Sequence, residues 1–389
     1  MPSLPLPSSE ALAHSAKLAA LIRTEIDAAG GWLGFDRYMA LALYAPGLGY
    51  YSAGLEKFGV DGDFVTAPEI SPLFGRCLAR QAAQVLGAAG GDMLELGAGS
   101  GKLAVDVLTE LDRLERLPER YLILEVSASL RETQKERINS RLPLRISQKI
   151  EWLDALPESF TGMVLGNEVL DALPTHLVAW HEAGVGERGV GERGVAVEDG
   201  RFVWRDKPLH EGRLFEAAYG LALPPGHVSE IGLAAGSLMG SLAGMLDRGV
   251  VLMLDYGFPR REYYHPQRAQ GTLMCHYRHH AHDDPFLHPG LQDITTHVDF
   301  TAAAEAAVAQ GASLLGYATQ TQFLINCGIT NLLAEVSPAD VATYLPLAAQ
   351  AQKLLSPAEM GELFKAIAFG KGMEQPLIGF VRGDKRHTL

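Results

Sequence analysis

One stretch decides the fold of this chain: Met93-Leu94-Glu95-Leu96-Gly97-Ala98-Gly99-Ser100-Gly101-Lys102-Leu103. A short apolar strand precedes the glycines, and the residues from Lys102 to Glu110 follow a helical pattern. Glycines permit a tight turn and let a ligand approach the backbone, and the start of a helix offers free N–H groups to a polar ligand. The stretch therefore predicts a strand, a ligand-binding turn and a helix in succession.

The same alternation continues along the chain. Helical patterns cover Ser9–Ala29, Leu73–Leu86, Ser129–Ile138, Ser229–Leu246 and Phe300–Gln310. A further helix is predicted from Trp32, and it runs into a turn-rich stretch at Tyr44–Tyr51. Further predicted strands are Tyr121–Glu125, a weaker Leu144–Ser147, Gly162–Gly166, Val250–Leu254, and a last pair at Ser313–Ile325 and Leu377–Val381. Alternating strands and helices favour a parallel sheet that is covered on both faces. We therefore predict an α/β fold with a Rossmann-like sheet.

The composition is that of a folded, acidic protein. The 389 residues are 47% apolar and carry 33 basic against 46 acidic side chains, a net charge of −13. Because binding to nucleic acid needs a basic face, we expect no nucleic-acid partner. No apolar run approaches the ~20 residues that cross a bilayer, and neither the start of the chain nor its three cysteines suggests secretion. We expect a cytoplasmic protein with no membrane partner.

The chain is longer than one compact domain requires. We predict a helical cap with a ligand-covering loop over residues 1–90, and a core over 91–180 and 247–389. Residues 181–246 are predicted to be an insertion between the fourth and fifth core strands, for substrate binding or for a homodimer. The insertion contains Gly-Val-Gly-Glu-Arg at 184–188, repeated at 189–193, which we interpret as a duplicated turn between two strands. The irregular, His-rich stretch 260–288 is typical of a lid.

The glycine turn does not fit the dinucleotide fingerprint, because Lys102 stands where GxGxxG needs a small residue. The frame GxGxG, with Glu95 two residues before the first glycine, resembles motif I of S-adenosylmethionine-dependent methyltransferases. Glu95 would hold the amino-acid end of this cofactor. Glu125 ends the next strand, where paired carboxylate oxygens suit the two ribose hydroxyls. The alternative is a glycine turn without a ligand and a solvated Glu125.

Two further acids, Glu168 and Asp171, follow the fourth predicted strand, where a substrate would face the cofactor. Paired carboxylates can hold the planar donors of a guanidinium in bidentate fashion. The alternatives are that one of them caps a helix beginning near Val169, or that Asp171 pins a turn. Asn167, at the end of the strand, would contact the cofactor or order this loop.

The sequence resembles the MidA-like family, which includes the mitochondrial methyltransferase needed for the assembly of respiratory complex I. The resemblance runs from about Leu18 to Gly383 and rests on the following segments: Tyr44–Tyr51, Gly62–Ser71, Glu95–Lys102, Asn167–Pro174, Leu254–Gly257 and Asp293–Phe300. It implies a seven-stranded methyltransferase core with an N-terminal helical extension, S-adenosyl-L-methionine as cofactor, and methylation of arginine on a protein. The Gly-Val-Gly-Glu-Arg duplication departs from the family pattern and puts only the local insertion in doubt.

The predicted roles divide between the cofactor and the reaction. The predicted cofactor-binding residues are Thr66, Glu95, Gly97, Ala98, Gly99, Ser100, Gly101, Glu125, Val126, Trp152 and Asn167; the predicted catalytic residues are Glu168, Asp171 and His297. Trp152 would cover the adenine or, alternatively, is a packed aromatic. His297 would bond a carboxylate or help to remove a proton, or it bridges loops. The histidines near His280 lack a matching ligand set, so we expect no metal site.

The resemblance leaves other functions open. A partner that presents a basic side chain is the first expectation, and a methyltransferase acting on a small molecule or on another protein side chain is the second. The third is an assembly chaperone that binds the cofactor without turnover. The presence of Glu95, Glu125 and Glu168 favours the enzymes.

Overall fold

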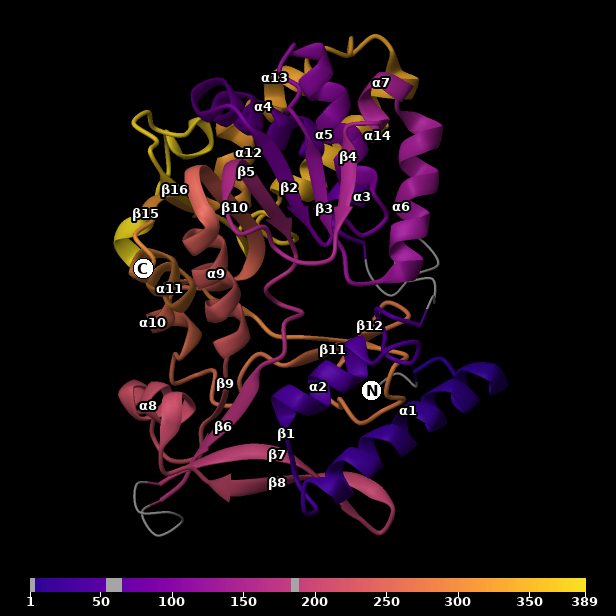
Figure 1. The fold of residues 1–389 in the computed structure, drawn as a ribbon, viewed down its shortest axis with the longest axis vertical. Coiled ribbons are helices and arrows are strands. Elements are labelled where there is room, and N and C mark those ends of the chain that lie inside the picture. The colour runs from indigo at the N-terminus through magenta and orange to yellow at the C-terminus, as the bar shows by residue number, and fades with distance from the viewer. Residues whose placement is uncertain (1–3, 54–64, 183–188) are drawn as a thin grey trace.

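The computed structural model describes residues 4–53, 65–182 and 189–389. Figure 1 shows a large α/β part that carries the main sheet, and a smaller part in which a second sheet lies beside the N-terminal helices. The α/β fold predicted from the alternating pattern is confirmed, but the main sheet is mixed rather than wholly parallel.

The main sheet has the strand order β15-β16-β10-β5-β2-β3-β4, and β14 pairs with the end of β10. Five neighbouring strands of this sheet, β4, β3, β2, β5 and β10, run parallel to one another. β16 is antiparallel to both β10 and β15. The strand bounds are β2 Asp92–Leu96, β3 Tyr121–Leu124, β4 Ile150–Leu153, β5 Phe160–Asn167, β10 Leu246–Phe258, β14 Val298–Asp299, β15 Ser313–Thr319 and β16 Phe364–Lys371.

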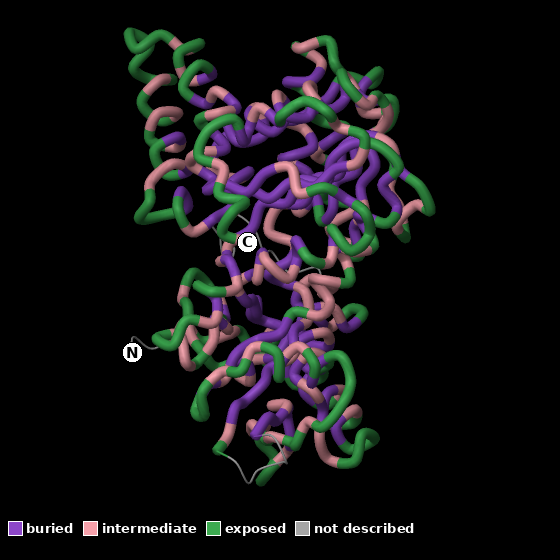
Figure 2. The backbone as a smooth tube through the Cα atoms, turned by 90° about the vertical axis from the view of Figure 1, so that its left-hand side faces the viewer, coloured by how far each residue is buried: buried purple, intermediate pink, exposed green. Residues whose placement is uncertain are grey.

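Alternation along the central strands sends neighbouring side chains to opposite faces of this sheet. Met93 and Met163 pack into the core beneath α4 and α5, and Leu94 and Val164 pack into the core beneath α9 and α11. The helices of the main part are α3 Ala67–Ile70, α4 Pro72–Ala89, α5 Lys102–Arg113, α6 Ala128–Arg141, α7 Leu144–Ser147, α9 Leu233–Met245, α10 Arg260–Tyr263, α11 Phe300–Ala309, α12 Gln320–Asn326, α13 Ile329–Leu333 and α14 Val341–Leu355. The buried residues in Figure 2 concentrate in the layers around this sheet.

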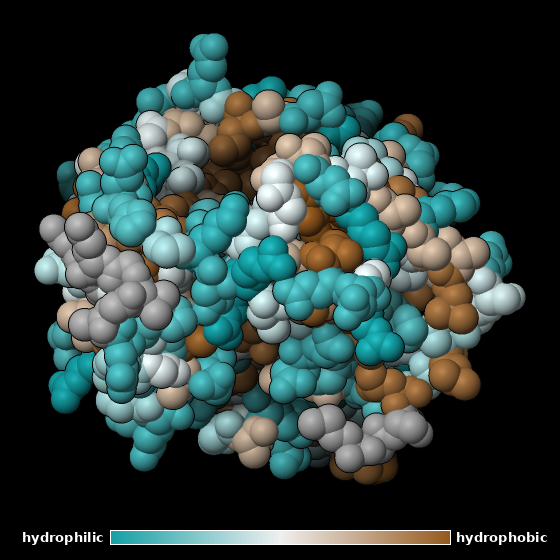
Figure 3. Space-filling view, turned by 90° about the horizontal axis from the view of Figure 1, so that it is seen from below, coloured by the Kyte–Doolittle hydropathy of each residue, from teal (hydrophilic) through white to brown (hydrophobic). Residues whose placement is uncertain are grey.

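A second sheet, with the order β1-β7-β6-β9 and β8 on the outer side of β7, forms the smaller part. Its elements are α1 Ser9–Ala28, β1 Leu33–Gly34, α2 Phe35–Tyr44, β6 His176–Trp180, β7 Val190–Glu198, β8 Arg201–Pro208, α8 Gly212–Leu221 and β9 Val228–Ile231. Helices α1 and α2 pack on it through an aromatic cluster that includes Phe35, Tyr38 and Trp204. The N-terminal helices therefore lie against the segment between β5 and β10. The smaller part forms the end of the molecule seen in Figure 3, where teal hydrophilic residues prevail between separate brown apolar patches.

The His-rich stretch 260–288 contains a short helix and a β-hairpin. β11 Met274–Tyr277 pairs with β12 His280–His282 and with β13 Asp293–Thr295 in a three-stranded sheet between the two parts. The rest of the stretch is mainly turn and irregular backbone, as the sequence predicts, and His276 lies in the central strand of this small sheet.

Three predicted elements are wrong. Leu144–Ser147 is helix α7, which follows Pro143 and leaves Leu144 exposed, and the buried strand comes later, at β4. Leu377–Val381 holds a 3-10 turn, η1 Ile378–Phe380, in which Gly379 packs against Phe323; the last strand of the sheet is β16. Ser229–Leu246 is helical only over α9, because its first residues pair with β6 as β9.

Two further boundaries shift. Within Ser313–Ile325 only β15 is a strand, and the chain turns into α12 at Gln320. In the duplicated pentapeptide, residues 184–188 lie outside the described residues, whereas Val190–Arg193 of the second copy belong to β7 rather than to a turn. The predicted division of the chain into domains stays a prediction; its boundary at 180 falls between β6 and β7, which pair with each other. A second 3-10 turn, η2 Arg386–Thr388, ends the chain.

None of the helices in the described ranges combines the length and the apolar character that a membrane span requires.

Candidate active site

A cavity of about 1020 Å³ opens at the carboxyl ends of β2, β3 and β5. This is the edge at which open α/β sheets bind ligands. The opposite walls come from the turn after α2, from α3 and from the three-stranded sheet. The cavity brings together all the predicted site residues except Gly101 and Trp152: Thr66, Glu95, Gly97, Ala98, Gly99, Ser100, Glu125, Val126, Asn167, Glu168, Asp171 and His297.

The glycine turn requires left-handed backbone at three positions. Gly97, Gly99 and Gly101 have φ values of +59°, +51° and +79°, which residues with a Cβ rarely adopt. At Gly97 the closest atom to an added Cβ would be 3.7 Å away, so its backbone faces the open cavity. At Gly101 an added Cβ would lie 3.2 Å from the Cα of Gln134. Gly101 therefore allows α6 to pack on the turn rather than lining the cavity.

Glu95 is a buried carboxyl at the end of β2. Its Oε2 accepts a hydrogen bond of 2.7 Å from the hydroxyl of Tyr121. Burial raises the pKa of Glu95 to about 7, the hydroxyl of Tyr121 opposes the rise, and the charge of Glu125 adds to it. A ligand that brings a positive charge, such as an ammonium group, would stabilise the ionised form.

Glu125 lies at the end of β3 in a cradle of donors. Its Oε1 accepts from the backbone N–H of Ser127 at 2.9 Å, and its Oε2 accepts from Nε2 of Gln134 at 3.1 Å. The same Nε2 donates to the carbonyl of Gly99 at 3.0 Å, so one amide group spans the glycine turn and the acid. Sequence reasoning missed Gln134, and a fully buried glutamine in an otherwise polar helix has no local signal.

Trp152 lies outside the cavity and supports Gln134, one of the donors to Glu125. It lies within β4 rather than after it, and its Nε1 donates to Oε1 of Gln134 at 2.9 Å. The ring therefore packs against α6 and does not line the cavity, as the predicted adenine contact would require. The alternative interpretation of Trp152, a packed aromatic, describes its place better.

Glu168 occupies a strained position directly after β5. It is a non-glycine residue with φ of +53°, and its backbone N–H donates to the carbonyl of Leu254 at 2.8 Å. Its carboxylate accepts from Nδ2 of Asn167 at 2.9 Å. Burial raises the pKa of Glu168 to about 8, and the charge of Asp171 adds to this rise. Strained residues cluster at active sites.

Asp171 is a buried acid on the same side of the cavity as Glu168. The hydroxyl of Tyr256 donates to its Oδ2 at 2.6 Å, while its Oδ1 is buried without a hydrogen-bond partner. Burial raises the pKa of Asp171, and the bond from Tyr256 opposes the rise. Within the described residues, neither Asp171 nor Glu168 forms an ion pair with a lysine or arginine. The oxygen without a partner therefore marks a place for a donor from a ligand.

Asp255, which sequence reasoning did not single out, holds the turn that carries these acids. Its Oδ2 accepts from the backbone N–H groups of Val169, Leu170 and Asp171 at 3.1, 2.8 and 3.3 Å, and its Oδ1 accepts from that of Tyr256 at 2.9 Å. No helix begins at Val169, so neither Glu168 nor Asp171 is a helix cap. Burial raises the pKa of Asp255, with the charges of Asp171 and Glu168 adding.

His297 lies at the back of the cavity between two aromatic rings. It stacks on Phe258 and meets Tyr256 edge-on, and its Nδ1 is buried without a hydrogen-bond partner. Burial lowers the pKa of His297 to about 4, and the positive charges of Arg268 and Lys365 add to this effect. The imidazole is therefore neutral at pH 7.

Helix α3 covers the glycine turn. Thr66 precedes it and lines the cavity. Glu69 accepts a hydrogen bond from the hydroxyl of Ser100, and Nη1 of Arg137 donates to that hydroxyl oxygen at 2.9 Å. Ser100 is therefore tied to the covering segment and to α6.

The outer wall of the cavity contains residues from the smaller part. Tyr44 and Tyr51 stack with their ring centres 5.5 Å apart. The hydroxyl of Tyr44 donates to the carbonyl of Ala172 at 2.8 Å, and that of Tyr51 donates to the carboxylate of Asp293 at 3.1 Å. The family segments Tyr44–Tyr51 and Asp293–Phe300 contained this signal, because they meet at the cavity although about 240 residues separate them.

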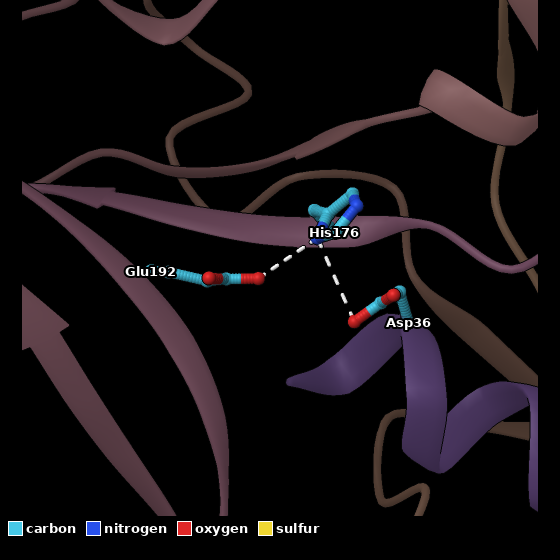
Figure 4. Close-up of side chains that lie close together, drawn as sticks. All are labelled: Asp36, His176 and Glu192. Carbon is cyan, nitrogen blue, oxygen red and sulfur yellow. Dashed lines mark hydrogen bonds and ion pairs between the residues drawn. The ribbon is translucent and has the colours of Figure 1, made fainter. Parts of the chain in front are cut away.

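A separate cluster of titratable groups lies away from this cavity. Nδ1 of His176 is 2.8 Å from Oε1 of Glu192 and 3.6 Å from Oδ1 of Asp36, and Figure 4 shows the three side chains converging from β6, β7 and α2. Burial opposes the charge on His176, but the hydrogen bond to Glu192 and the charges of both acids raise its pKa overall. The cluster is an ion-pair link between α2 and the second sheet.

The cavity suits S-adenosyl-L-methionine. One side offers the exposed backbone of Gly97 and Gly99 with carboxylates at the ends of two adjacent strands, and the amide oxygen of Asn167 is buried without a partner. Paired carboxylate oxygens match a vicinal diol. A cavity of this volume also exceeds what a ligand of drug size usually needs. These features define the class of S-adenosylmethionine-dependent methyltransferases.

Comparison with known proteins agrees with that class. Residues 77–318 match the family described as "Putative S-adenosyl-L-methionine-dependent methyltransferase". The chain belongs to this family, and the resemblance to MidA-like methyltransferases is confirmed. The family also identifies the cofactor as S-adenosyl-L-methionine.

Solved and curated relatives extend over nearly the whole chain. A crystal structure from Burkholderia thailandensis of a superfamily member bound to S-adenosyl-homocysteine is similar with a TM-score of 0.95, 52% identity and 100% coverage of both chains. The mitochondrial protein arginine methyltransferase NDUFAF7 of Danio rerio is 30% identical, over 87% of this chain and 83% of its own length. The Drosophila melanogaster homologue is 28% identical, over 97% of this chain and 91% of its own.

Proposed function

We propose that this methyltransferase acts on the guanidinium group of an arginine in a protein. One observation carries the proposal: the carboxyls of the half-buried Glu168 and the buried Asp171 both line the cofactor cavity, and no lysine or arginine of the described chain pairs with them. A guanidinium presents planar paired donors that fit two carboxylates. The names of the Danio rerio and Drosophila melanogaster relatives, both protein arginine methyltransferases, support the same acceptor.

The chain contributes to catalysis mainly by positioning. Methyl transfer is an in-line displacement, and the bound cofactor supplies an electrophilic methyl group. Glu168 and Asp171 would hold the acceptor nitrogen on that line, and Asp255 fixes the turn that carries both acids. Tyr256 orients Asp171 through its hydroxyl.

The guanidinium must also lose a proton when its nitrogen gains a methyl group. The positive charge of the bound guanidinium ionises Glu168, and its carboxylate then accepts this proton, which burial favours by raising the pKa of Glu168. His297 is neutral, and its Nδ1 without a partner is the second candidate acceptor. We assign Glu168 the direct role because it stands beside Asn167 at the end of β5.

The strand order supports a seven-stranded methyltransferase core. Reading β4-β3-β2-β5-β10-β16-β15, the ligand edge lies at β2, where the order reverses. In this assignment, α1 and α2 are the N-terminal extension, and the segment from β6 to α9 is the insertion between the fourth and fifth core strands.

The test uses cofactor labelled with tritium on the methyl group. We expect transfer to an arginine of a protein acceptor, a loss of at least a hundredfold in Glu168→Gln, and wild-type transfer in the exposed control Glu132→Gln. Comparing arginine methylation by mass spectrometry in cells with and without the gene would find the acceptor. Undiminished transfer by Glu168→Gln would overturn the role of Glu168.

The identity of the labelled product separates the remaining functions. Methylarginine after hydrolysis of the protein supports the proposal. Label in another side chain or in a small molecule would replace arginine as the acceptor. Cofactor binding without any transfer would instead support an assembly chaperone.

A further inference from the structure

A second cavity, of about 580 Å³, lies behind the turn that carries Asp171. Its walls come largely from α8, α9, α10 and α11, and the exposed residues Arg213 and Glu216 of α8 and Glu305 of α11 lie at its edge. Of the described residues that line it, none belongs to the glycine turn or to the ends of β2 and β3. The second cavity is therefore separate from the half of the first cavity that suits the cofactor.

Two segments form the partition between the cavities. In the turn after β5, Asp171 lines the cofactor cavity, whereas Leu170 and Thr175 line the second cavity. In the segment after β13, Thr295 lines the cofactor cavity and Thr296 lines the second. The backbone N–H of Thr296 donates to the carbonyl of Asp171 at 3.0 Å and so joins the two segments.

The partition is thin at two side chains. Leu173 and His297 line both cavities, so the cavities meet there. In the second cavity, the hydroxyl of Thr175 is buried without a hydrogen-bond partner, and only 2% of this residue is exposed. Because buried polar groups are normally hydrogen-bonded, this hydroxyl offers a place for a polar group of a ligand.

Charge and reaction geometry indicate which ligand the second cavity receives. Acids outnumber bases among its described lining residues, which favours a basic ligand; the acids are Glu216, Glu230, Asp299 and Glu305, and the bases are Arg213 and Arg260. An in-line displacement requires the acceptor to approach the methyl group from the side opposite the sulfur. With the cofactor on the glycine turn, an acceptor that arrives at Asp171 through the partition comes from the far side of the cofactor.

We propose that the protein acceptor enters through the second cavity. A segment that contains the target arginine lies between α8, α9 and α11, and the hydroxyl of Thr175 hydrogen-bonds its backbone. The arginine side chain then passes Leu173 and His297 and reaches Glu168 and Asp171. The inference rests on the proposed function for the arginine acceptor, and it adds the route and the docking surface.

The experiment fills the second cavity at two glycines. A Cβ added at Gly236 of α9 would meet only the Cβ of Ala306, at 3.9 Å, and one added at Gly220 of α8 would meet nothing within 4 Å. The variants are Gly236→Phe and Gly220→Trp. The control is Gly87→Trp, because Gly87 is an exposed helical glycine with equally open space and lines neither cavity.

Transfer is measured with tritium-labelled S-adenosyl-L-methionine and total protein from cells that lack the gene, as methylarginine after hydrolysis. We expect both cavity variants to bind S-adenosyl-homocysteine within about twofold of the wild type in calorimetry, and to lose at least about tenfold in the initial rate of transfer. Gly87→Trp should match the wild type in both measurements. If Gly236→Phe does not fold, the exposed Gly220→Trp must show the same two results.

Wild-type transfer in a folded variant of either glycine would overturn the route. A loss of S-adenosyl-homocysteine affinity that equals the loss of transfer would also overturn it, because the second cavity would then serve the cofactor. Label in another side chain or in a small molecule contradicts the proposed function instead. In that case the arginine segment is overturned as the occupant, and a loss of this labelling in both variants still supports the route.

Discussion

The two functional walls of the cavity are built in different ways. The cofactor wall, formed by Gly97–Gly101, Glu95 and Glu125, takes its support from nearby sequence, such as the hydroxyl of Tyr121 and the amide of Gln134. The acid wall, formed by Asn167, Glu168 and Asp171, depends on groups that are distant in the chain. Asp255 follows the residues it holds by 84 to 86 positions, and Tyr256 follows Asp171 by 85.

The cofactor wall and the acid wall also differ in their electrostatics. On the cofactor wall, each carboxylate accepts bonds that favour its ionised form, and burial still raises the pKa of Glu95. On the acid wall, the half-buried Glu168 lies near the buried Asp171 and Asp255, so each charge raises the cost of the others. Such a cluster of acids lowers the stability of the fold while no cation is bound, and a positively charged acceptor would offset the repulsion. The comparison suggests that the first wall is a preformed site and the second is strained.

The largest expected effect concerns the support of the acid wall. Asp255→Ala leaves four buried backbone N–H groups without their acceptor, so we expect a loss of about 2–4 kcal/mol in the free energy of unfolding. Urea denaturation measures it, with the exposed Asp247→Ala on the same strand as control. A loss below 0.5 kcal/mol in Asp255→Ala, as is usual for surface substitutions, would show that the turn does not depend on this carboxylate.

Glu168 should make stability depend on pH. Its pKa is raised from 4.5 to about 8 in the folded protein, so the folded state binds the proton more tightly than the unfolded state. This contribution to stability is complete below pH 4.5 and is lost as the pH rises through 8. Glu168→Gln should therefore lose less stability than the wild type between pH 5 and pH 9, by about 2 kcal/mol, in denaturation curves at both pH values. Parallel curves for the two proteins would contradict a strained acid wall.

A smaller effect is expected behind the cofactor wall. Trp152→Phe removes the donor to Gln134, a loss of about 1 kcal/mol for one hydrogen bond, so affinity for S-adenosyl-homocysteine should fall roughly threefold to tenfold. Trp204→Phe, in the second sheet, is the matched control for calorimetry. Unchanged affinity in Trp152→Phe would mean that the cradle around Glu125 holds without this bond.

The smallest effect lies outside both walls, in the link of Figure 4. The pKa of His176 is raised overall from 6.5, so its ion pairs stabilise the fold fully below pH 6.5, and this contribution is lost as the pH rises through the folded pKa. His176→Gln should thus cost about 0.5–1 kcal/mol at pH 6 and less at pH 9. The exposed His210→Gln is the control in thermal denaturation. A cost that grows with pH would contradict the ion-pair assignment.

The sequence could predict the parts that depend on local pattern. The strand, glycine turn and helix around Gly97–Gly101 form as expected, because glycines with positive φ and an amphipathic helix leave local signatures. Glu125 could be placed for the same reason, since it ends the next strand. The prediction for Trp152 fails because the third core strand is β4 rather than Leu144–Ser147. Trp152 therefore lies within this strand instead of after it.

The rest depends on tertiary contacts that no local pattern carries. Nothing near Glu168 indicates that its backbone N–H meets the carbonyl of Leu254, or that Asp255 holds the turn beside it. The last strand of the main sheet, β16, is equally hard to predict from the sequence. β16 is buried along nearly its whole length between β10 and β15, while its alanines, glycine and lysines gave it a weaker apolar signal than Leu377–Val381.

The most direct test of the two-wall account measures binding and transfer on two matched variants, Glu125→Gln and Glu168→Gln. Calorimetry with S-adenosyl-homocysteine and tritium transfer to the protein acceptor are run on both. We predict that Glu125→Gln binds at least tenfold more weakly, and that Glu168→Gln binds within threefold of the wild type but loses transfer at least a hundredfold. Equal losses of binding in the two variants, or full transfer by Glu168→Gln, would contradict the account.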